Sequence, residues 1–228
     1  MNALLERLRG GLVVSVQAEA DSVLNEPAAI ALLARCAAAN GAVAVRIDGA
    51  ARIAAVRAAI DIPIVGIVKR KHDGFEPYIT STLGEVEEVA GAGADIVAFD
   101  ATERPRAEGA ALAELVAAAH GRGLAAMADC ATVADVANAT AAGAEIVAST
   151  LAGYTPATVG RVLPDLALVA ASAALHAFAI CEGGIGTPAQ ARAAFAAGAS
   201  AVVVGTAITN IDALVRGFAA AAPRTSTE

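Results

Sequence analysis

Residues 177–208 read AFAICEGGIGTPAQARAAFAAGASAVVVGTAI. An apolar run at 177–182 ends in a glycine turn, an alanine-rich segment follows at 187–197, and a second apolar run occupies 201–208. Neither run alternates with polar residues, which is typical of parallel strands that are buried on both faces. Alanine favours helix, and the middle segment opens with a Thr-Pro pair and is followed by a glycine. The stretch therefore predicts a strand, a helix and a second, parallel strand.

The same pattern of strand and then helix repeats along the whole chain. Eight such units fit a closed barrel better than an open sheet, which usually has five or six strands. No linker-like segment divides the chain, so we predict one α/β domain, a (β/α)8 TIM barrel over residues 1–228, with 223–228 as a frayed tail. The expected strands are 12–18, 42–47, 62–69, 95–102, 124–130, 145–151, 177–182 and 201–208. The expected helices are 27–40, 50–60, 83–92, 108–121, 132–142, 166–175, 187–197 and 210–221.

Composition excludes several classes of protein. Hydrophobic residues make up 57 % of the 228 residues and charged residues 17 %, which excludes a disordered chain. The net charge is −7 and the basic run at 69–72 is short, so we expect no nucleic-acid partner. The most apolar stretch, 166–181, is shorter than the roughly 20 residues of a membrane span, and no signal peptide is visible. Cys36, Cys130 and Cys181 form no C-x-x-C pair, which indicates buried thiols in a reducing compartment, and we expect a cytoplasmic protein without membrane attachment.

Polar residues gather where the expected strands end, and in a (β/α)8 barrel the carboxyl ends of the strands face the site. Lys69 follows an apolar run and has two cationic neighbours, which favours a functional role. Asp129 and Glu182 also follow apolar runs, and because buried carboxylates need partners, an ion pair with Lys or Arg is their structural alternative. For Arg46, a solvated position at the rim of the barrel fits the sequence as well as a functional role does. The set at the strand ends is Gln17, Arg46, Lys69, Asp100, Thr102, Asp129, Ser149, Thr150, Glu182, Gly205 and Thr206.

The cysteines and histidines show no pattern typical of a nucleophile or a metal site. Cys130 and Cys181 have no histidine beside them in the sequence, which favours strand packing. His72, His120 and His176 lack the spacing of metal ligands, so we expect no metal. His72 lies close to Lys69 and is a second candidate base.

Glycines after the last two expected strands indicate a phosphate site. Gly183-Gly184 follows one strand, and Gly205-Thr206 lies near the end of the other. Glycine lets backbone N–H groups approach an anion, and a helix N-terminus adds favourable partial charge. The loops after strands seven and eight form the usual phosphate site of this barrel, so the pair of turns predicts a phosphorylated ligand.

Nine segments of the chain, in order, match the motifs of a known family: Ser15–Ala18, Val45–Gly49, Gly66–Arg70, Tyr78–Thr82, Asp100–Arg106, Met127–Cys130, Ser149–Thr155, Glu182–Ile185 and Val204–Thr209. In these segments the chain resembles the bacterial N-acetylmannosamine-6-phosphate 2-epimerases, and the resemblance extends over nearly its whole length. This resemblance implies a TIM barrel that interconverts the 6-phosphates of N-acetylmannosamine and N-acetylglucosamine in sialic acid catabolism, without metal or nucleotide cofactor.

Residue roles follow from the same resemblance. It implies that Lys69 is the catalytic lysine and Glu182 the catalytic carboxylate. It implies further that the sugar and its N-acetyl group are held by Gln17, Arg46 and Asp129, and the phosphate by the turns with Gly183, Gly184, Gly205 and Thr206. Three positions depart from the family pattern, namely Ser81 for proline, Glu103 for a frequently basic residue, and Asn210 for arginine. The last departure removes one expected contact to the phosphate or the sugar rim, for which Arg70 or Lys71 are candidate replacements.

Epimerisation at C2 requires an acidic C2–H, which ring opening to the aldehyde supplies. A neutral Lys69 would act as base, because an apolar strand end and nearby cations lower the pKa of a lysine. Glu182 would move a proton at C2 on the other face or at the ring oxygen. Two alternatives remain, a Schiff-base aldolase of a phosphorylated sugar and a phosphosugar-binding barrel without turnover, in which Lys69 and Glu182 form only an ion pair. A homodimer is the candidate assembly.

Overall fold

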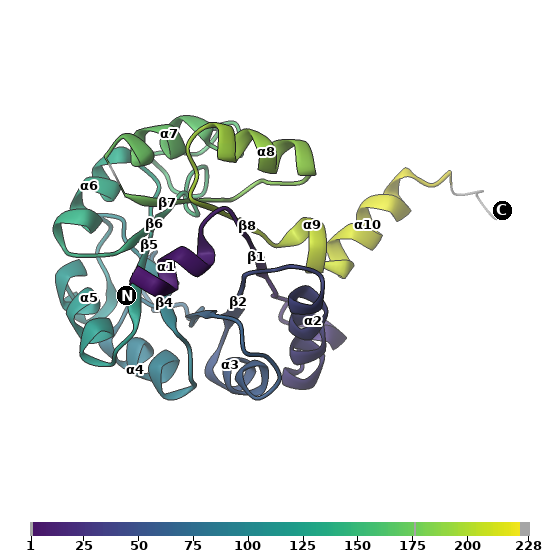
Figure 1. Cartoon of the computed structure of the whole chain (residues 1–228), viewed down its shortest axis with the longest axis horizontal. Helices are drawn as coiled ribbons and strands as arrows, with labels where there is room; N and C mark the ends of the chain where they lie inside the picture. The colour runs from purple at the N-terminus through teal and green to yellow at the C-terminus, as the bar shows by residue number, and fades with distance from the viewer. Residues whose placement is uncertain (1, 176, 224–228) are drawn as a thin grey trace.

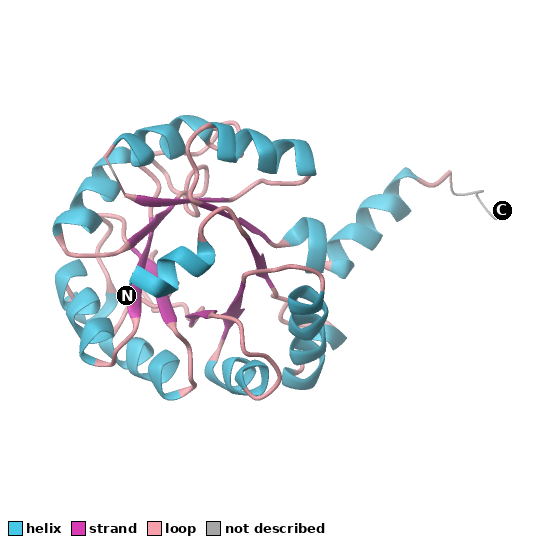
Figure 2. Ribbon diagram, in the orientation of Figure 1, coloured by secondary structure: helices cyan, strands magenta, loops and turns pink. Residues whose placement is uncertain are grey.

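Eight parallel strands close into a barrel in the computed structural model, which describes residues 2–175 and 177–223 (Figures 1 and 2). Each strand pairs with its neighbours in sequence order, and β8 pairs with β1. This arrangement confirms the predicted TIM barrel. The strands are β1 Leu12–Ser15, β2 Ala44–Asp48, β3 Ile64–Ile67, β4 Ile96–Asp100, β5 Ala125–Asp129, β6 Ile146–Ala148, β7 Phe178–Glu182 and β8 Ala201–Val204.

Helices surround the barrel, and their first residues follow the capping rules. The side chains of Thr82, Thr132 and Thr187 each accept a backbone N–H of the helix that they precede, and Pro27 opens another helix. The helices are α1 Asn2–Leu8, α2 Pro27–Ala39, α3 Ala50–Arg57, α4 Leu83–Gly91, α5 Leu112–Gly121, α6 Val133–Ala141, α7 Leu166–Ala174, α8 Pro188–Ala196, α9 Thr206–Thr209 and α10 Ile211–Ala221. Short 3-10 turns occupy Val23–Asn25 and Ala107–Gly109.

The core has two layers, because alternate residues of each strand face the barrel axis or the helices. Inward side chains such as Val65, Met127 and Val203 fill the barrel, and Leu8 of α1 packs against them. Figure 1 shows α1 across the barrel opening at the amino ends of the strands. Outward side chains pack beneath the helices in a second layer. The polar site is thereby confined to the carboxyl ends of the strands.

Several predicted boundaries are wrong where polar residues or glycines turn the chain. The run predicted as a strand over 201–208 ends at Val204, because the chain turns at Gly205 and residues Thr206–Thr209 form α9. The hydroxyl of Thr209 donates to the backbone oxygen of Ser15 at 2.7 Å and ties this turn to β1. The run predicted over 145–151 is a strand only at Ile146–Ala148.

Two further expectations need correction. The helix predicted over 108–121 begins at Leu112, because Glu108 and Gly109 adopt positive φ and end a 3-10 turn. Cys36, predicted to be buried, is exposed on α2, whereas Cys130 and Cys181 are buried as predicted. Of the predicted frayed tail, Pro223 is described and residues 224–228 lie outside the described residues, as does His176.

Candidate active site

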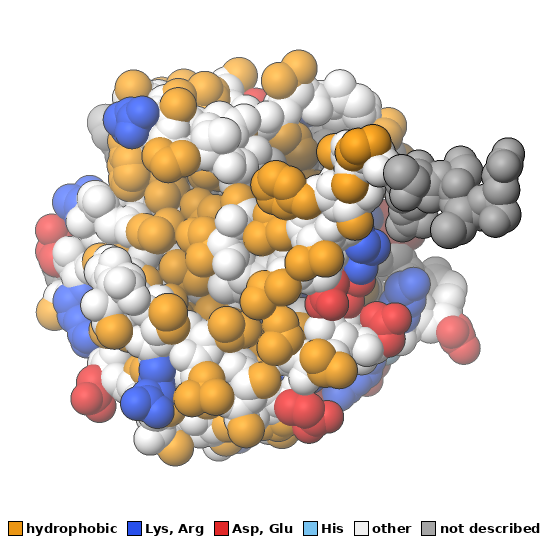
Figure 3. All heavy atoms as spheres, turned by 90° about the vertical axis from the view of Figure 1, so that its right-hand side faces the viewer, with side chains coloured by type: hydrophobic (Ala, Val, Ile, Leu, Met, Phe, Trp, Pro, Cys, Tyr) orange, Lys and Arg blue, Asp and Glu red, His pale blue; other side chains and the backbone are white. Residues whose placement is uncertain are grey.

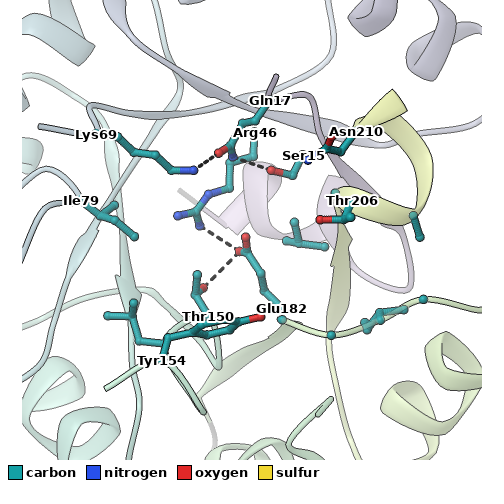
Figure 4. A pocket seen from close by; sticks show the side chains of 18 of the residues that line it. Ser15, Gln17, Arg46, Lys69, Ile79, Thr150, Tyr154, Glu182, Thr206 and Asn210 are labelled. Carbon is teal, nitrogen blue, oxygen red and sulfur yellow. Dashed lines mark hydrogen bonds and ion pairs between the residues drawn. The ribbon is translucent and has the colours of Figure 1, made fainter. Parts of the chain in front are cut away.

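A cavity of about 800 Å³ opens at the carboxyl ends of the strands (Figure 4). Loops after β1, β3, β6, β7 and β8 supply most of its lining, together with Arg46 of β2. The cavity brings together eight of the predicted site residues, namely Gln17, Arg46, Lys69, Glu182, Gly183, Gly184, Gly205 and Thr206. Asp129, the ninth, does not line it, because its carboxylate is buried behind Arg46.

Arg46 forms the floor of the cavity and is bound to two carboxylates. Its Nη1 and Nη2 donate to the two carboxylate oxygens of Asp129 at 3.0 and 2.6 Å, a bidentate pair. Nη1 also donates to Oε2 of Glu182 at 2.9 Å. The side chains of Arg46 and Asp129 are 1 % and 0 % exposed, so Arg46 is not the solvated rim residue that its sequence position also allowed. Burial alone would lower the pKa of Arg46, but the charges of Asp129 and Glu182 raise it above its usual value.

Glu182 ends β7 and retains a route to the cavity, since its side chain is 12 % exposed. Its Oε2 lies 2.9 Å from Arg46 and 3.1 Å from the hydroxyl of Thr150. Burial raises the pKa of Glu182, the guanidinium of Arg46 opposes this, and the charge of Asp129 raises it further. One guanidinium faces two carboxylates here, so a proton on Glu182 relieves the repulsion between them. The raised pKa increases the protonated fraction of Glu182, the form that can donate a proton.

Lys69 lies at the opposite side of the cavity, just beyond β3. Its backbone N–H donates to Asp48 at 2.8 Å, and a β-bridge to Ile79 folds the following loop back over the strand end. Its ammonium contacts Oε1 of Gln17, whose Nε2 donates to the hydroxyl of Ser15 at 2.5 Å. The side chain is open to the cavity, yet surrounding protein removes much of its water, and this burial, together with the charge of Arg46, lowers the pKa of Lys69. A lowered pKa increases the fraction of neutral amine, the form that acts as a base.

The two glycine turns meet at one side of the cavity. Gly183 and Gly184 have φ of 100° and 75°, a region that L residues rarely adopt, and a side chain at Gly184 would overlap Leu163. A Cβ on Gly205 would lie 3.2 Å from the Cβ of Ser15. The first N–H groups of α9 have no partner within that helix and lie beside these turns. Backbone N–H groups without helical partners at this place favour an anion.

Residue Asn210 also lines the cavity, but its side chain is engaged at the start of α10. Its Oδ1 accepts the N–H of Ala213 at 2.9 Å, and its Nδ2 lies 3.4 Å from Glu19. Arg70 and Lys71, the predicted replacements for the family arginine, do not line the cavity. Arg70 forms an ion pair with Glu88 at 2.9 Å outside the cavity.

His72 and the cysteines lie apart from this chemistry. Nε2 of His72 is 3.0 Å from Glu85 on α4, away from the cavity lining. Burial raises the pKa of the Cys130 thiol well above its usual range and that of Cys181 to about 11, so both thiols stay protonated. Three lining residues, Ser15, Thr150 and Tyr154, had no assigned role in the sequence analysis, because their contacts depend on which strand ends face one another.

Among residues 2–175 and 177–223, no three His, Cys, Asp or Glu side chains group as ligands for a metal ion. None of the helices described is both long and apolar enough to cross a membrane.

Comparison with known proteins agrees with this architecture. A family model described as "Putative N-acetylmannosamine-6-phosphate epimerase" matches residues 30–224. Proteins from Synechococcus elongatus and Escherichia coli strain HS, each named "Putative N-acetylmannosamine-6-phosphate 2-epimerase", are both 45 % identical to this chain. The first match covers 95 % of both sequences, and the second covers 89 % of this chain and 87 % of the relative.

Solved structures of other proteins share this barrel fold. The N-acetylmannosamine-6-phosphate 2-epimerase from Clostridium perfringens superposes with a TM-score of 0.92 at 34 % identity, over 96 % of each chain. A 3-hexulose-6-phosphate synthase superposes with a TM-score of 0.59 at 20 % identity and covers 87 % of this chain and 91 % of its own. The second likeness shows a shared barrel fold alone.

Proposed function

Because this chain belongs to the N-acetylmannosamine-6-phosphate 2-epimerase family, we propose that it interconverts the 6-phosphates of N-acetylmannosamine and N-acetylglucosamine through proton transfer by Lys69 and Glu182. The chain is an isomerase of carbohydrates by that membership. One observation carries the proposed mechanism: Lys69 and Glu182 reach the same cavity from β3 and β7, on opposite sides of the barrel. Each has its own partner, Gln17 for Lys69 and Arg46 for Glu182, and no ion pair joins them in the described chain.

The two sugars differ only in configuration at C2. In the ring-opened sugar, C2 is adjacent to the aldehyde, so its proton can leave and the negative charge moves to the aldehyde oxygen. Lys69, as neutral amine, removes this proton from one face, and protonated Glu182 delivers a proton to the other face. The resulting ammonium and carboxylate exchange protons with solvent or product before the next turnover. The guanidinium of Arg46 supplies positive charge for the anion formed between the two steps.

Substrate placement follows from the two polar ends of the cavity. The phosphate lies at the turns Gly183-Gly184 and Gly205-Thr206, where glycine and α9 present backbone N–H groups. The sugar then extends across the cavity towards Gln17, Arg46 and Lys69. Direct contact of Asp129 with the sugar, implied by the resemblance, would require movement of its bidentate partner Arg46.

Incubation with each 6-phosphate in deuterated water, followed by NMR, tests the function. Epimerisation with deuterium at C2 supports proton transfer. Sugar binding without exchange at C2 would support the alternative of a barrel without turnover, although the separate partners of Lys69 and Glu182 already argue against a simple ion pair. Borohydride reduction in the presence of substrate tests the aldolase alternative, since an irreversible adduct on Lys69 would show an imine.

We also propose that the chain forms a homodimer through α10. This helix projects from the barrel beside α2 (Figure 1), and no residue of it is buried. Ile211, Leu214, Val215 and Phe218 share one face of it at the spacing of an amphipathic helix, and Phe218 is 80 % exposed. An isolated helix of eleven residues is only marginally stable in water, so its apolar face requires a partner.

A second copy of the chain fits that requirement. In a (β/α)8 barrel a helix follows each strand and covers the sheet, but α9 after β8 has only four residues. The helix that should complete the outer ring is α10. Its first half touches its own barrel through Leu214, which lines the cavity, and through the ion pair of Arg216 with Glu19, and its second half projects away (Figure 1). Hydrophobic side chains gather over the face of the molecule from which α10 projects (Figure 3). Reciprocal exchange of α10 between two copies would complete both rings with a two-fold axis.

A further inference from the structure

The hydroxyl of Thr150 lies between the two carboxylates that share Arg46. It is 2.7 Å from Oδ1 of Asp129. It is 3.1 Å from Oε2 of Glu182, a contact that Figure 4 marks with a dashed line. The same two oxygens accept hydrogen bonds from Nη1 of Arg46 at 3.0 and 2.9 Å. Thr150 is therefore the second group, besides Arg46, that links Asp129 to Glu182.

The loop that carries Thr150 is held in place on both sides. The hydroxyl of Ser149 donates to the backbone oxygen of Glu182 at 2.9 Å and accepts its N–H at 3.1 Å. On the other side, the N–H of Leu151 donates to the backbone oxygen of Cys130 at 3.1 Å. These bonds fasten the end of β6 to β5 and β7, so the position of the Thr150 hydroxyl is fixed by backbone that has little freedom to move.

Both contacts of the Glu182 carboxylate engage Oε2. Oε1 has no hydrogen-bond partner among residues 2–175 and 177–223, and Glu182 lines the cavity. A carboxyl group with one oxygen held by two fixed donors cannot rotate freely, so the other oxygen keeps a constant direction. Oε1 is therefore the oxygen that is free to carry a transferred proton.

We propose that Thr150 is a positioning residue for the epimerisation, which holds Oε2 of Glu182 so that Oε1 exchanges the proton with C2 of the sugar. The proposal rests on the proposed function. Threonine has one hydroxyl proton, so it donates to one carboxylate at a time. It donates to Oε2 while Glu182 delivers its proton from Oε1, and Asp129 keeps its bidentate bond to Arg46. The hydroxyl thus stabilises the carboxylate at the moment at which its charge appears, without taking up or losing a proton itself.

Kinetics of Thr150→Val and Thr150→Ser in both directions test this role. Thr150→Val removes the hydroxyl at nearly constant shape, and we expect kcat to fall about 10–100-fold with little change in KM, the scale of a misplaced reacting group. Thr150→Ser keeps the hydroxyl and should restore most of kcat. Thr140→Val, which removes a threonine hydroxyl bonded to a helix carbonyl on α6, is the matched control and should behave as wild type.

The pH profile and a double variant separate positioning from a general structural effect. A hydroxyl that donates to Glu182 lowers the pKa of that carboxyl. Thr150→Val should therefore shift the limb of the kcat profile that follows ionisation of Glu182 to higher pH. If Thr150 acts through Glu182, adding Thr150→Val to the Glu182→Gln variant should lower kcat little further. Thr150→Ala serves the same comparisons if the valine variant does not fold.

Three results would overturn the proposal: wild-type kcat in a folded Thr150→Val or Thr150→Ala, failure of Thr150→Ser to recover activity, or full additivity with Glu182→Gln. A wild-type protein that epimerises neither sugar would overturn the proposed function itself. That failure is distinct, because it appears before any variant is compared.

Discussion

Arg46 places one positive charge between two acids, and the protonation of Glu182 depends on this imbalance. It forms a bidentate bond to Asp129 and a single hydrogen bond to Glu182. Lys69 lies within the same field, and Arg46 helps to lower its pKa. Burial and the charge of Asp129 raise the pKa of Glu182 against the opposing effect of Arg46, whereas burial and Arg46 both lower the pKa of Lys69. The acid and the base are therefore shifted in the directions that proton transfer between them requires.

The pH dependence of catalysis should follow the charge beside Lys69. Asp48 accepts the N–H of Lys69, and its negative charge raises the pKa of that lysine against the effects of burial and Arg46. Asp48→Asn keeps an acceptor but removes the charge, so the pKa of Lys69 should fall further. Because the neutral amine is the active form and is lost as pH falls through its pKa, the acid limb of kcat/KM should move to lower pH.

A pH series of kcat/KM on Asp48→Asn and the wild type measures this shift. Glu87→Gln, which removes an exposed acid that pairs with Arg122, is the matched control and should leave the limb in place. An acid limb that stays fixed or moves upward in Asp48→Asn would contradict the assignment of that limb to Lys69.

Lys69 and Glu182 were predicted from the sequence because both follow apolar strands, and the structure places both in one cavity. Their catalytic roles stay a prediction. The position of Asp129 behind Arg46 could not be predicted, because sequence position gives the strand end but not which of two neighbouring side chains faces the cavity. The contact between Thr150 and Glu182 could not be predicted either, since it joins the loop after β6 to the end of β7, 32 positions further along the chain.

At the scale of the elements, the turn after β7 requires the positive φ of Gly183 and Gly184, and the turn after β8 packs closely at Gly205. Gly205 has φ of −114°, which any residue adopts, so a substitution there tests space rather than backbone strain. Gly205→Val would place its side chain against Ser15 and into the phosphate end of the cavity. We expect KM for the phosphosugar to rise strongly while kcat changes less.

Steady-state kinetics of Gly205→Val in parallel with Gly121→Val checks this expectation. Gly121 ends α5, and a Cβ there would meet no atom within 4 Å, so it is a control for a glycine outside the site. An unchanged KM in Gly205→Val would contradict the placement of the phosphate at this turn.

At the start of α10, Asn210→Arg should change both ligand affinity and helix stability. Asn210→Arg would add a positive charge at the cavity, and a charge-assisted hydrogen bond should tighten phosphosugar binding by about 1–3 kcal/mol with turnover roughly intact. It would also remove the bond to Ala213 that caps α10, at a cost of about 0.5–2 kcal/mol in helix stability. Calorimetric titration and thermal unfolding measure the two effects separately, and unchanged affinity would mean that residue 210 does not face the ligand.

The order of the elements could be predicted because continuous apolar runs and glycine stops follow from burial and helix geometry. The predicted ends of strands were wrong where a few residues turn the chain, as at Gly205 after β8 and in the segment 149–151 after β6. The direction of α10 could not be predicted either, because its apolar stripe indicates a buried face without saying what buries it.

At the scale of the whole molecule, the proposed exchange of α10 predicts a concentration-dependent dimer. Phe218→Glu places a charge on the exposed apolar face of α10, so the dimer should dissociate to monomers. Sedimentation velocity on this variant and on Arg192→Glu, a charge change on α8, measures the difference. A monomeric wild type, or a Phe218→Glu protein that remains dimeric, would contradict the proposed interface.

In the proposed mechanism, Lys69 and Glu182, on opposite sides of one barrel, move the proton at C2. NMR of wild type, Lys69→Ala and Glu182→Gln with each 6-phosphate in deuterated water is the decisive measurement of that mechanism. We expect epimerisation with deuterium at C2 for wild type, loss of both for Lys69→Ala, and loss of epimerisation with slow residual exchange on one epimer for Glu182→Gln, each loss being about 10²–10⁴-fold or more. Near wild-type epimerisation by Lys69→Ala would contradict the mechanism.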